Sequence, residues 1–336
     1  MAGRTAIDPW SISVEDFPLR GSTSDKLKFA LRYASRAPST HNTQPWNFRL
    51  VGDAIELHSD RRRLLSIVDP AGRELIISCG AALFFLRVAL KRFGFRAEVE
   101  FETGAQTLLA VVRIAGDHDA TVDERAMFDA IARRQTNRHE FESRPVPDAH
   151  IDRLTQSAVG EGAWLEPVSD EPRKRALAGL VADANRIQFA DNAFRGELAS
   201  WIRDEESSDG MPTHGVPLSQ VGEPLQTFFR AFDSGGKVAE SERELALGAD
   251  DSRAWLAVGQ ALASVLLTAC VLNLSASFSI SRSRFHPTGR LSRRQSGAAA
   301  IRSCCSAWAM GRLRARPRVA LCRTSCSSSP RWPRGC

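Results

Sequence analysis

The chain has 336 residues, 43% of them hydrophobic, so it is long enough for one large domain or two ordinary ones. Its net charge of +6 hides a sharp division, because 13 of the 45 basic residues are arginines in residues 279–336, where there is no Lys, Asp or Glu. The preceding residues carry 32 basic and 39 acidic side chains, which excludes a uniformly basic surface for nucleic acid.

Cysteine usage and the N-terminus indicate a cytoplasmic protein. Before residue 279 the chain has two cysteines, Cys79 and Cys270, and such distant cysteines are typical of a reducing compartment. The first 17 residues lack the apolar stretch of a signal peptide. The uncharged run 254–281 contains Gln, Thr, Asn and several Ser, which favours a buried helix over a membrane span.

Residues 1–23 are expected to form an N-terminal arm, and residues 24–122 a first structural unit. Ser24 is predicted to cap a helix whose apolar residues recur at three- and four-residue spacing up to Pro38. Gly52-Asp53 separates WNFRLV from AIELHS and predicts a hairpin. ELIISCGAALFFLRVALKRFG is typical of a buried helix ended by a glycine, and the strands AEVEFE and LLAVVRIA are expected after it.

Residues 123–278 are expected to form a second unit. It begins with a helix to about Arg134, a stiff turn in QTNRHEFESRPVP and another helix from Asp148. Residues from about 205 to 248 are rich in loop-forming residues and predict a lid-like insertion. SRAWLAVGQALASVLLTACVLNL predicts a last long helix.

The two long apolar helices resemble each other. Three positions of the first helix have the same offsets as three positions of the second, namely Gly80, Leu83 and Ala89 against Gly259, Leu262 and Thr268. Each also follows a shorter amphipathic helix, which suggests two diverged copies of one unit. The alternative is that unrelated alanine-rich core helices match equally well, and the helices alone leave this open.

The segment APSTHNTQPWNF, residues 37–48, concentrates polar side chains. Four hydrogen-bonding residues fall within six positions: Ser39, Thr40, Asn42 and Gln44. The neighbouring prolines and Trp46 fix the backbone and supply an apolar wall, which suits a flat ligand with polar edges. The alternative is a helix end whose small polar residues close the backbone while Trp46 belongs to the core.

A second segment, RRQTNRHEF, concentrates positive charge. Arg133, Arg134 and Arg138 surround Thr136 and Asn137. Guanidinium groups beside a hydroxyl and turn amides suit a phosphate. The alternative is a solvated charged turn.

Together these segments resemble a known family. APS-x-x-N-x-Q-P-W-x-F, RR-x-x-x-R-x-x-F followed by RPVP, and DPAGRELIISCGAAL at residues 69–83 resemble the FMN-dependent nitroreductase superfamily, particularly its Acg-like branch of NAD(P)H nitroreductases. The resemblance covers about residues 26–278. It implies an α+β, nitroreductase-like fold with a central mixed sheet flanked by helices.

The resemblance also implies how the site is divided. Ordinary members are homodimers whose subunits each supply a phosphate-binding turn and an APSxxNxQPW loop. Here residues 24–122 hold the loop and residues 123–278 hold the turn, which implies a single-chain pseudo-dimer of two diverged halves with one FMN site. By the resemblance, the flavin ring or ribityl chain contacts Ser39, Thr40, Asn42 and Gln44, and the phosphate contacts Arg134, Thr136 and Arg138.

Residues 279–336 are interpreted as a frameshifted, disordered tail. Family members continue with segments similar to FLNQPIEVP and PQLLxRLGHG. One nucleotide inserted after the Phe278 codon converts permitted codons of FSISRSRFH into FLNQPIEVP, and the same frame turns residues 300–311 into NPQLLFRLGHG. The alternatives are a basic arm that binds nucleic acid non-specifically and a zinc site at Cys322 and Cys326, which lacks a following His pair. We assign no metal ligand.

The leading functional interpretation is an FMN-dependent oxidoreductase. NAD(P)H reduces the flavin by hydride transfer, and a nitroaromatic or quinone-like acceptor takes the electrons. Because the flavin carries this chemistry, no catalytic side chain is assigned. The alternatives are an FMN-storing or FMN-sensing protein without turnover and an inactive truncated product. The expected partner is a small-molecule acceptor, with no specific nucleic acid and no membrane, and the chain is expected to be a monomeric pseudo-dimer or a weak homo-oligomer.

Overall fold

The computed structural model describes residues 12–102, 107–137, 141, 144–203, 207–212, 251–280 and 306–311. The helices are α1 (Thr23–Ala34), α2 (Arg73–Arg92), α3 (Val122–Arg133), α4 (Asp148–Val159), α5 (Glu171–Ala190), α6 (Asn192–Ser200) and α7 (Ser252–Val271). The strands are β1 (Trp46–Val51), β2 (Ala54–Ser59), β3 (Phe95–Phe101), β4 (Leu108–Asp117), β5 (Ile202–Arg203), β6 (Met211–Pro212), β7 (Ser275–Ile280) and β8 (Ser306–Gly311). Short 3-10 turns lie at Val14–Asp16, Thr40–Asn42 and Arg61–Arg63.

The main sheet has four strands in the order β1-β2-β4-β3, and every neighbouring pair is antiparallel. The predicted hairpin is confirmed, with Gly52 in the left-handed region at φ 58° where β1 turns into β2. The expectation of a mixed sheet is wrong for these four strands. They alternate in direction because a tight turn or short loop joins β1 to β2 and β3 to β4, and such links connect antiparallel strands.

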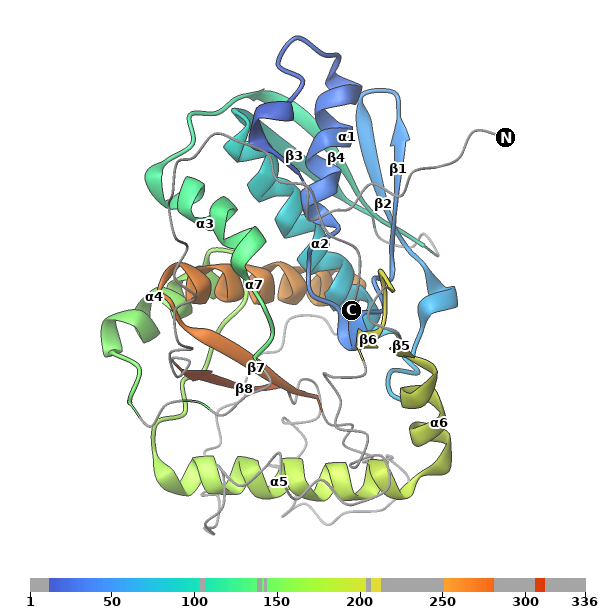
Figure 1. The fold of residues 1–336 in the computed structure, drawn as a ribbon, viewed down its shortest axis with the longest axis vertical. Helices are drawn as coiled ribbons and strands as arrows, with labels where there is room; N and C mark the ends of the chain where they lie inside the picture. Colours follow the sequence, from blue (N-terminus) through green and yellow to red (C-terminus); the bar gives the residue numbers. More distant parts are fainter. Residues whose placement is uncertain are drawn as a thin grey trace, which may run out of the picture.

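Helices α1 and α2 cover one face of this sheet (Figure 1). The apolar residues of the strands alternate along the chain, so one side of β1 and β2 packs into the core while the other faces solvent. The predicted helix after the N-terminal arm is confirmed as α1, but Ser24 is not its cap. Ser22 caps α1, because its Oγ accepts from the Asp25 amide while the Asp25 carboxylate accepts from the Ser22 amide.

Helices α2 and α7 cross at the centre of the molecule (Figure 1). Gly80 of α2 and Gly259 of α7 lie at the crossing. A Cβ atom on Gly80 would lie 2.2 Å from the Leu256 carbonyl oxygen, and one on Gly259 would lie 2.0 Å from the Ile77 carbonyl oxygen. The two contacts are reciprocal, since each glycine meets the carbonyl three residues before the other. Only glycine permits this approach.

Helix α7 also supports α3 and α4. Helix α4 packs against it through Leu154 and Ala158, and α3 lies beside it. Arg87 of α2 forms an ion pair with Glu161 and donates to Gln260 Oε1 at 2.8 Å, which ties the end of α4 to both central helices. Within the described part of the chain, α7 is the single helix long and apolar enough to cross a membrane, and 61% of that stretch is buried, as in core helices.

Two predicted segments are described only in part. Of the lid-like insertion 205–248, the structure describes residues 207–212, and the remainder lies outside the described residues. Of the tail 279–336, it describes the end of β7 and strand β8, which pair antiparallel with Phe278 opposite Trp308. Cys322 and Cys326 lie outside the described residues.

Replacing Gly80 with Ala is expected to destabilise the protein. The added methyl group must push the Leu256 backbone away, and such overpacking costs about 1 to 3 kcal/mol of unfolding free energy. Gly179→Ala is the matched control, because Gly179 lies in α5 with open space around it and alanine favours helix by up to about 1 kcal/mol. Urea unfolding of the three proteins measures both effects. Equal stability of Gly80→Ala and wild type would contradict the close crossing.

Candidate functional site

The polar loop at residues 39–44 follows α1 and adopts an unusual backbone. Three of its non-glycine residues have positive φ: His41 at 50°, Asn42 at 53° and Gln44 at 48°. Such conformations cost free energy and cluster at functional sites. Ser39 holds the turn closed, because its Oγ accepts from the Gln44 amide at 2.9 Å. The side chain of Ser39 therefore shapes the loop from within.

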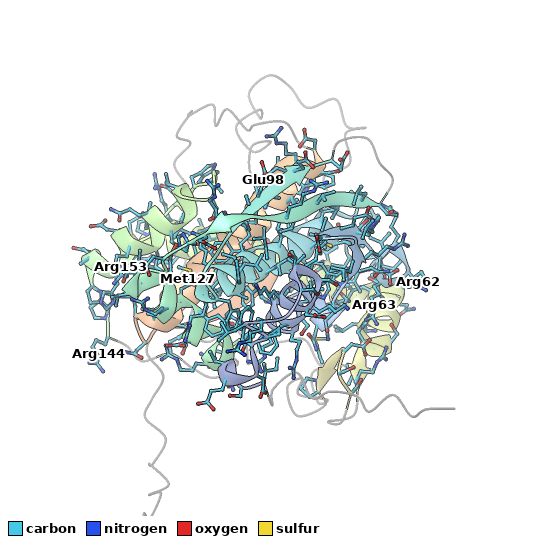
Figure 2. The ribbon with its side chains drawn as sticks, turned by 90° about the horizontal axis from the view of Figure 1, so that it is seen from above. Arg62, Arg63, Glu98, Met127, Arg144 and Arg153 are labelled. Carbon is cyan, nitrogen blue, oxygen red and sulfur yellow. The ribbon has the colours of Figure 1, made fainter. Side chains whose placement is uncertain are left out.

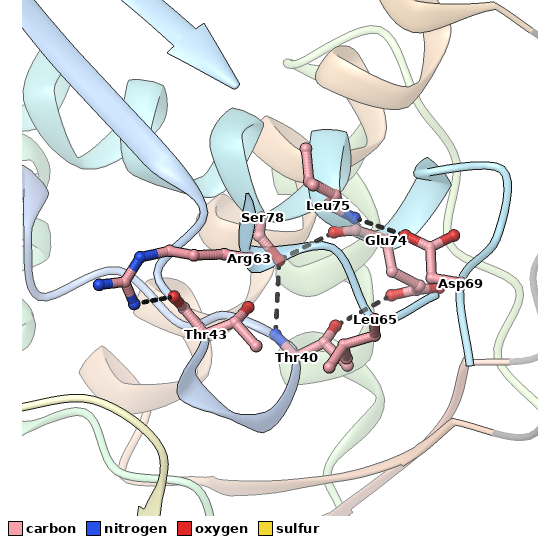
Figure 3. A pocket seen from close by; sticks show the side chains of 8 residues that line it. All are labelled: Thr40, Thr43, Arg63, Leu65, Asp69, Glu74, Leu75 and Ser78. Carbon is pink, nitrogen blue, oxygen red and sulfur yellow. Dashed lines mark hydrogen bonds between the residues drawn. The ribbon is translucent and has the colours of Figure 1, made fainter. Parts of the chain in front are cut away.

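Thr40 connects this loop to the first turns of α2. Its amide donates to Ser78 Oγ at 3.4 Å, and its hydroxyl donates to Glu74 Oε2 at 3.4 Å (Figure 3). Ser78 Oγ itself donates to the Glu74 backbone carbonyl at 2.8 Å. The start of α2 is thus in direct contact with a residue of the predicted flavin loop.

Two carboxyl groups lie at the N-terminus of α2. Asp69 is buried, and its oxygens accept from the Arg73 amide at 2.8 Å and the Leu75 amide at 2.9 Å. Burial raises the pKa of Asp69, although these backbone bonds oppose the shift. Burial, together with the negative charge of Asp69, raises the pKa of Glu74 to about 7. Glu74 therefore exchanges its proton near neutral pH.

Thr40, Asp69 and Glu74 line a small cavity with about 10 Å³ of room, enough for about one water molecule. Thr43, Arg63, Leu65, Leu75 and Ser78 complete its wall (Figure 3). Arg63 spans one side, where its Nη1 donates to the Thr43 carbonyl at 2.7 Å. The cavity combines hydroxyl, carboxyl and guanidinium groups beside the polar loop.

Residues 207–212 cover the polar loop. Asn42 Nδ2 donates to the Gly210 carbonyl at 3.0 Å, and the Gly210 amide donates to the Asn42 carbonyl at 3.1 Å. Gln44 Nε2 donates to the Ser208 carbonyl. Asp209 forms ion pairs with Arg63 at 2.8 Å and with Arg203 at 3.5 Å. The side-chain amides of Asn42 and Gln44, two of the predicted flavin-binding residues, thus donate hydrogen bonds to backbone carbonyl groups of this segment.

The predicted phosphate turn begins at Arg134, the residue after α3. Its Nε and Nη1 are buried and have no hydrogen-bond partner among the described residues. Burial lowers its pKa to about 10, so the guanidinium keeps its charge at neutral pH. Thr136 and Asn137 lie along β7, where the Asn137 amide donates to the Ala276 carbonyl at 2.7 Å. Arg138 lies outside the described residues.

The two predicted groups of site residues lie toward opposite ends of α7. Arg73, next to Glu74, has its guanidinium 5.3 Å from the Trp255 ring near the start of α7. Arg134 interacts electrostatically with Cys270, near the end of α7. At 1.5 Å per helical residue, Trp255 and Cys270 are about 22 Å apart along the axis. The groups are arranged around one helix, and no described contact joins them directly.

Sequence analysis missed Asp69, Glu74, Ser78 and Arg63 as site residues. The first three lie within or beside the motif DPAGRELIISCGAAL, which was noted for its resemblance alone. Asp69 and Glu74 lie next to the predicted start of a helix, where acidic side chains are favoured by the helix dipole. This position was the signal in the sequence that could have identified them. Arg63 gave no signal, because its partners Thr43 and Asp209 are far from it in sequence.

Comparison with known proteins identifies the family. No protein-family model matches the sequence. "Putative NAD(P)H nitroreductase Rv3131" of Mycobacterium tuberculosis is 34% identical over 264 residues, 75% of each chain. "Putative NAD(P)H nitroreductase acg" of the same organism is 30% identical over 267 residues, 75% of this chain and 79% of that protein. "Probable NAD(P)H nitroreductase PigM" of a Serratia strain is 26% identical over 217 residues, 61% and 59% of the chains. The chain belongs to the nitroreductase family.

Glu74 gives the protein a specific dependence of stability on pH. Its pKa is about 7 in the folded chain and 4.5 in a model peptide, so the folded protein binds more protons between these values. The free energy of unfolding therefore falls as pH rises through this range. Glu74→Gln stays uncharged and is expected to be more stable than wild type above about pH 8, by up to about 3 kcal/mol, and equal to it near pH 4.

Urea unfolding across pH measures this difference. Glu98→Gln is the matched control, because Glu98 is an exposed residue of β3 (Figure 2) and its substitution should leave the pH profile unchanged. A wild-type profile parallel to that of Glu74→Gln would show that folding does not raise the pKa of Glu74.

Proposed function

We propose that this protein is an FMN-dependent NAD(P)H oxidoreductase that reduces nitroaromatic or quinone-like acceptors. The observation that carries the proposal is the guanidinium of Arg134, whose Nε and Nη1 are buried without a hydrogen-bond partner in the part of the chain that the structure describes. Buried guanidinium nitrogens without an acceptor cost free energy, and a phosphate supplies a bidentate acceptor for such nitrogens. Membership of the nitroreductase family points to FMN as the source of that phosphate.

The polar loop fits the ring of the same cofactor. A flavin ring carries carbonyl oxygens along one edge, and the side-chain amides of Asn42 and Gln44 donate to the backbone carbonyls of residues 208 and 210. The loop therefore already presents donors to carbonyl acceptors. Since the loop and Arg134 lie toward opposite ends of α7, a ligand that touches both is elongated, with an anionic end and a flat polar end. FMN has this form.

The role of the protein in the proposed reaction is to bind and orient the flavin. When bound, FMN supplies hydride transfer between the nicotinamide and the acceptor. Arg134 and the turn at Thr136 would hold the phosphate, Asn42 and Gln44 would hold the ring edge, and Ser39 would keep the loop in shape through the Gln44 amide. No side-chain acid or base is required, and the acceptor is a small molecule.

We also propose the pseudo-dimer arrangement and a cytoplasmic location. The reciprocal contacts of Gly80 and Gly259 support two related halves, because a pair of like elements about a two-fold axis makes the same contact twice. The frameshift at residue 279 stays a prediction from the codons. Resequencing the coding DNA around Phe278 tests it, and an unaltered reading frame with native expression of this tail would contradict it.

Substituting Arg134 should weaken FMN binding. Arg134→Gln removes a charge-assisted pair worth about 1.5 to 3 kcal/mol, so the dissociation constant of FMN is expected to rise about 10- to 150-fold. Arg153→Gln is the control, because Arg153 is an exposed residue of α4 paired with Asp123 at 3.5 Å (Figure 2). Flavin fluorescence titration measures both constants. Equal FMN affinity in Arg134→Gln and wild type would show that Arg134 does not bind the FMN phosphate.

Turnover tests the activity itself. Purified protein incubated with FMN and freed of excess is expected to retain about one flavin per chain by its visible spectrum, and to oxidise NADH or NADPH when a nitroaromatic or quinone is added. Flavin-loaded protein that never oxidises either nucleotide would refute the oxidoreductase proposal while leaving FMN binding intact.

A second candidate function is FMN storage or sensing without turnover. The contacts of residues 207–212 with the polar loop favour it, since a segment held over the loop restricts access for a nicotinamide. Asp209→Asn removes the ion pairs with Arg63 and Arg203 and should loosen this segment, so nucleotide oxidation is expected to rise several-fold. Asp183→Asn, which breaks an exposed pair with Arg186 in α5, is the control. Equal rates in both variants would count against the restriction.

A further inference from the structure

The hydroxyl of Thr40 lies between the polar loop and a carboxyl group that changes charge near neutral pH. Thr40 Oγ1 is 3.4 Å from Glu74 Oε2, and both residues line the same cavity (Figure 3). A hydroxyl has one hydrogen to donate and two lone pairs that accept. The hydrogen bond between this hydroxyl and Glu74 therefore determines whether Thr40 can donate a hydrogen bond to a ligand or only accept one.

We propose that Glu74 is a positioning residue that sets the hydrogen-bond polarity of Thr40, and through it the pH at which the loop accepts a carbonyl-edged ring. The inference rests on the proposed flavin site. When Glu74 is a carboxylate, the Thr40 hydrogen is committed to it, and Thr40 presents only lone pairs to the cavity. When Glu74 is a carboxylic acid, it donates to Thr40 Oγ1, and the Thr40 hydrogen is free to bind a ligand carbonyl.

The surroundings of Glu74 place this change near neutral pH. Burial and the neighbouring negative charge of Asp69 raise its pKa to about 7, while the Thr40 hydroxyl and the positive charge of Arg73 oppose the shift. Arg63 lies across the cavity on the 3-10 turn before α2 and is paired with Asp209. Affinity for the ring should therefore be highest below this pKa and fall as pH rises through it.

Three variants separate the parts of the inference. Glu74→Gln keeps an amide that donates to Thr40 at every pH, so it mimics the acid. Thr40→Val removes the hydroxyl and keeps the shape. Glu98→Gln changes an exposed carboxyl of β3 and serves as the control. His41, which follows Thr40, is also ionisable, but it is present in all of these proteins. A difference in pH dependence between wild type and Glu74→Gln is therefore due to Glu74.

The experiment is a fluorescence titration of FMN at about pH 5.5 and pH 8.5 for each protein. The FMN phosphate also changes charge in this range. Because Glu74→Gln lacks the titrating carboxyl, the change in its FMN affinity with pH gives the contribution of the phosphate. Relative to that variant, wild type and Glu98→Gln are expected to lose a further 3- to 10-fold in affinity at the higher pH, the value of one hydrogen bond to a carbonyl. Thr40→Val should lack this additional loss.

The outcomes are distinct. An additional loss in wild type that disappears in both Glu74→Gln and Thr40→Val supports the inference. FMN binding with the same pH dependence in wild type and Glu74→Gln overturns it and leaves the proposed function standing. Absence of FMN binding at both pH values in all proteins overturns the proposed function and this inference together. The infrared carbonyl band of a protonated carboxyl, in the difference between wild type and Glu74→Gln, reports the proton on Glu74 directly.

Discussion

The close crossing of α2 and α7 is the constraint on which the rest of this structure depends. Two glycines, Gly80 and Gly259, let the backbones approach until only a hydrogen atom fits between each and the opposing carbonyl. This contact fixes where the first turn of α2 lies, and hence where Asp69 and Glu74 meet the polar loop. It also fixes the far end of α7, where Nε and Nη1 of Arg134 are buried.

Around this crossing the protein keeps charged groups in places where burial is costly. Glu74 responds by taking up a proton near neutral pH, whereas Arg134 stays charged although its Nε and Nη1 have no hydrogen-bond partner among the residues described. Such arrangements lower stability and persist where they bind or switch something. The proposed function accounts for both groups together, because the FMN that it invokes has a phosphate at one end and a ring at the other, and relatives of the chain are named as NAD(P)H nitroreductases.

Local sequence signals predicted most secondary-structure elements. The hairpin at Gly52, the buried helix ended by Gly94 and the last long helix follow from turn chemistry and apolar spacing, which act within a few residues. The cap of α1 was displaced by two residues because Ser22 and Ser24 carry the same side chain, and only the reciprocal bonds with Asp25 distinguish them. The predicted hairpin implies that β1 and β2 are antiparallel, but the pairing of β2 with β4 was not predicted, because these two strands lie far apart in the chain.

The sequence by itself determined the family, through the loop at residues 37–48 and the turn at residues 133–141, and with it the residues expected at the site. It also determined the charge division at residue 279. Only the tertiary structure decided that Thr40 contacts Glu74, that residues 207–212 lie over Asn42 and Gln44, and that Arg134 is enclosed. These are contacts between segments far apart in the chain, and burial and pKa depend on such contacts rather than on neighbours in sequence.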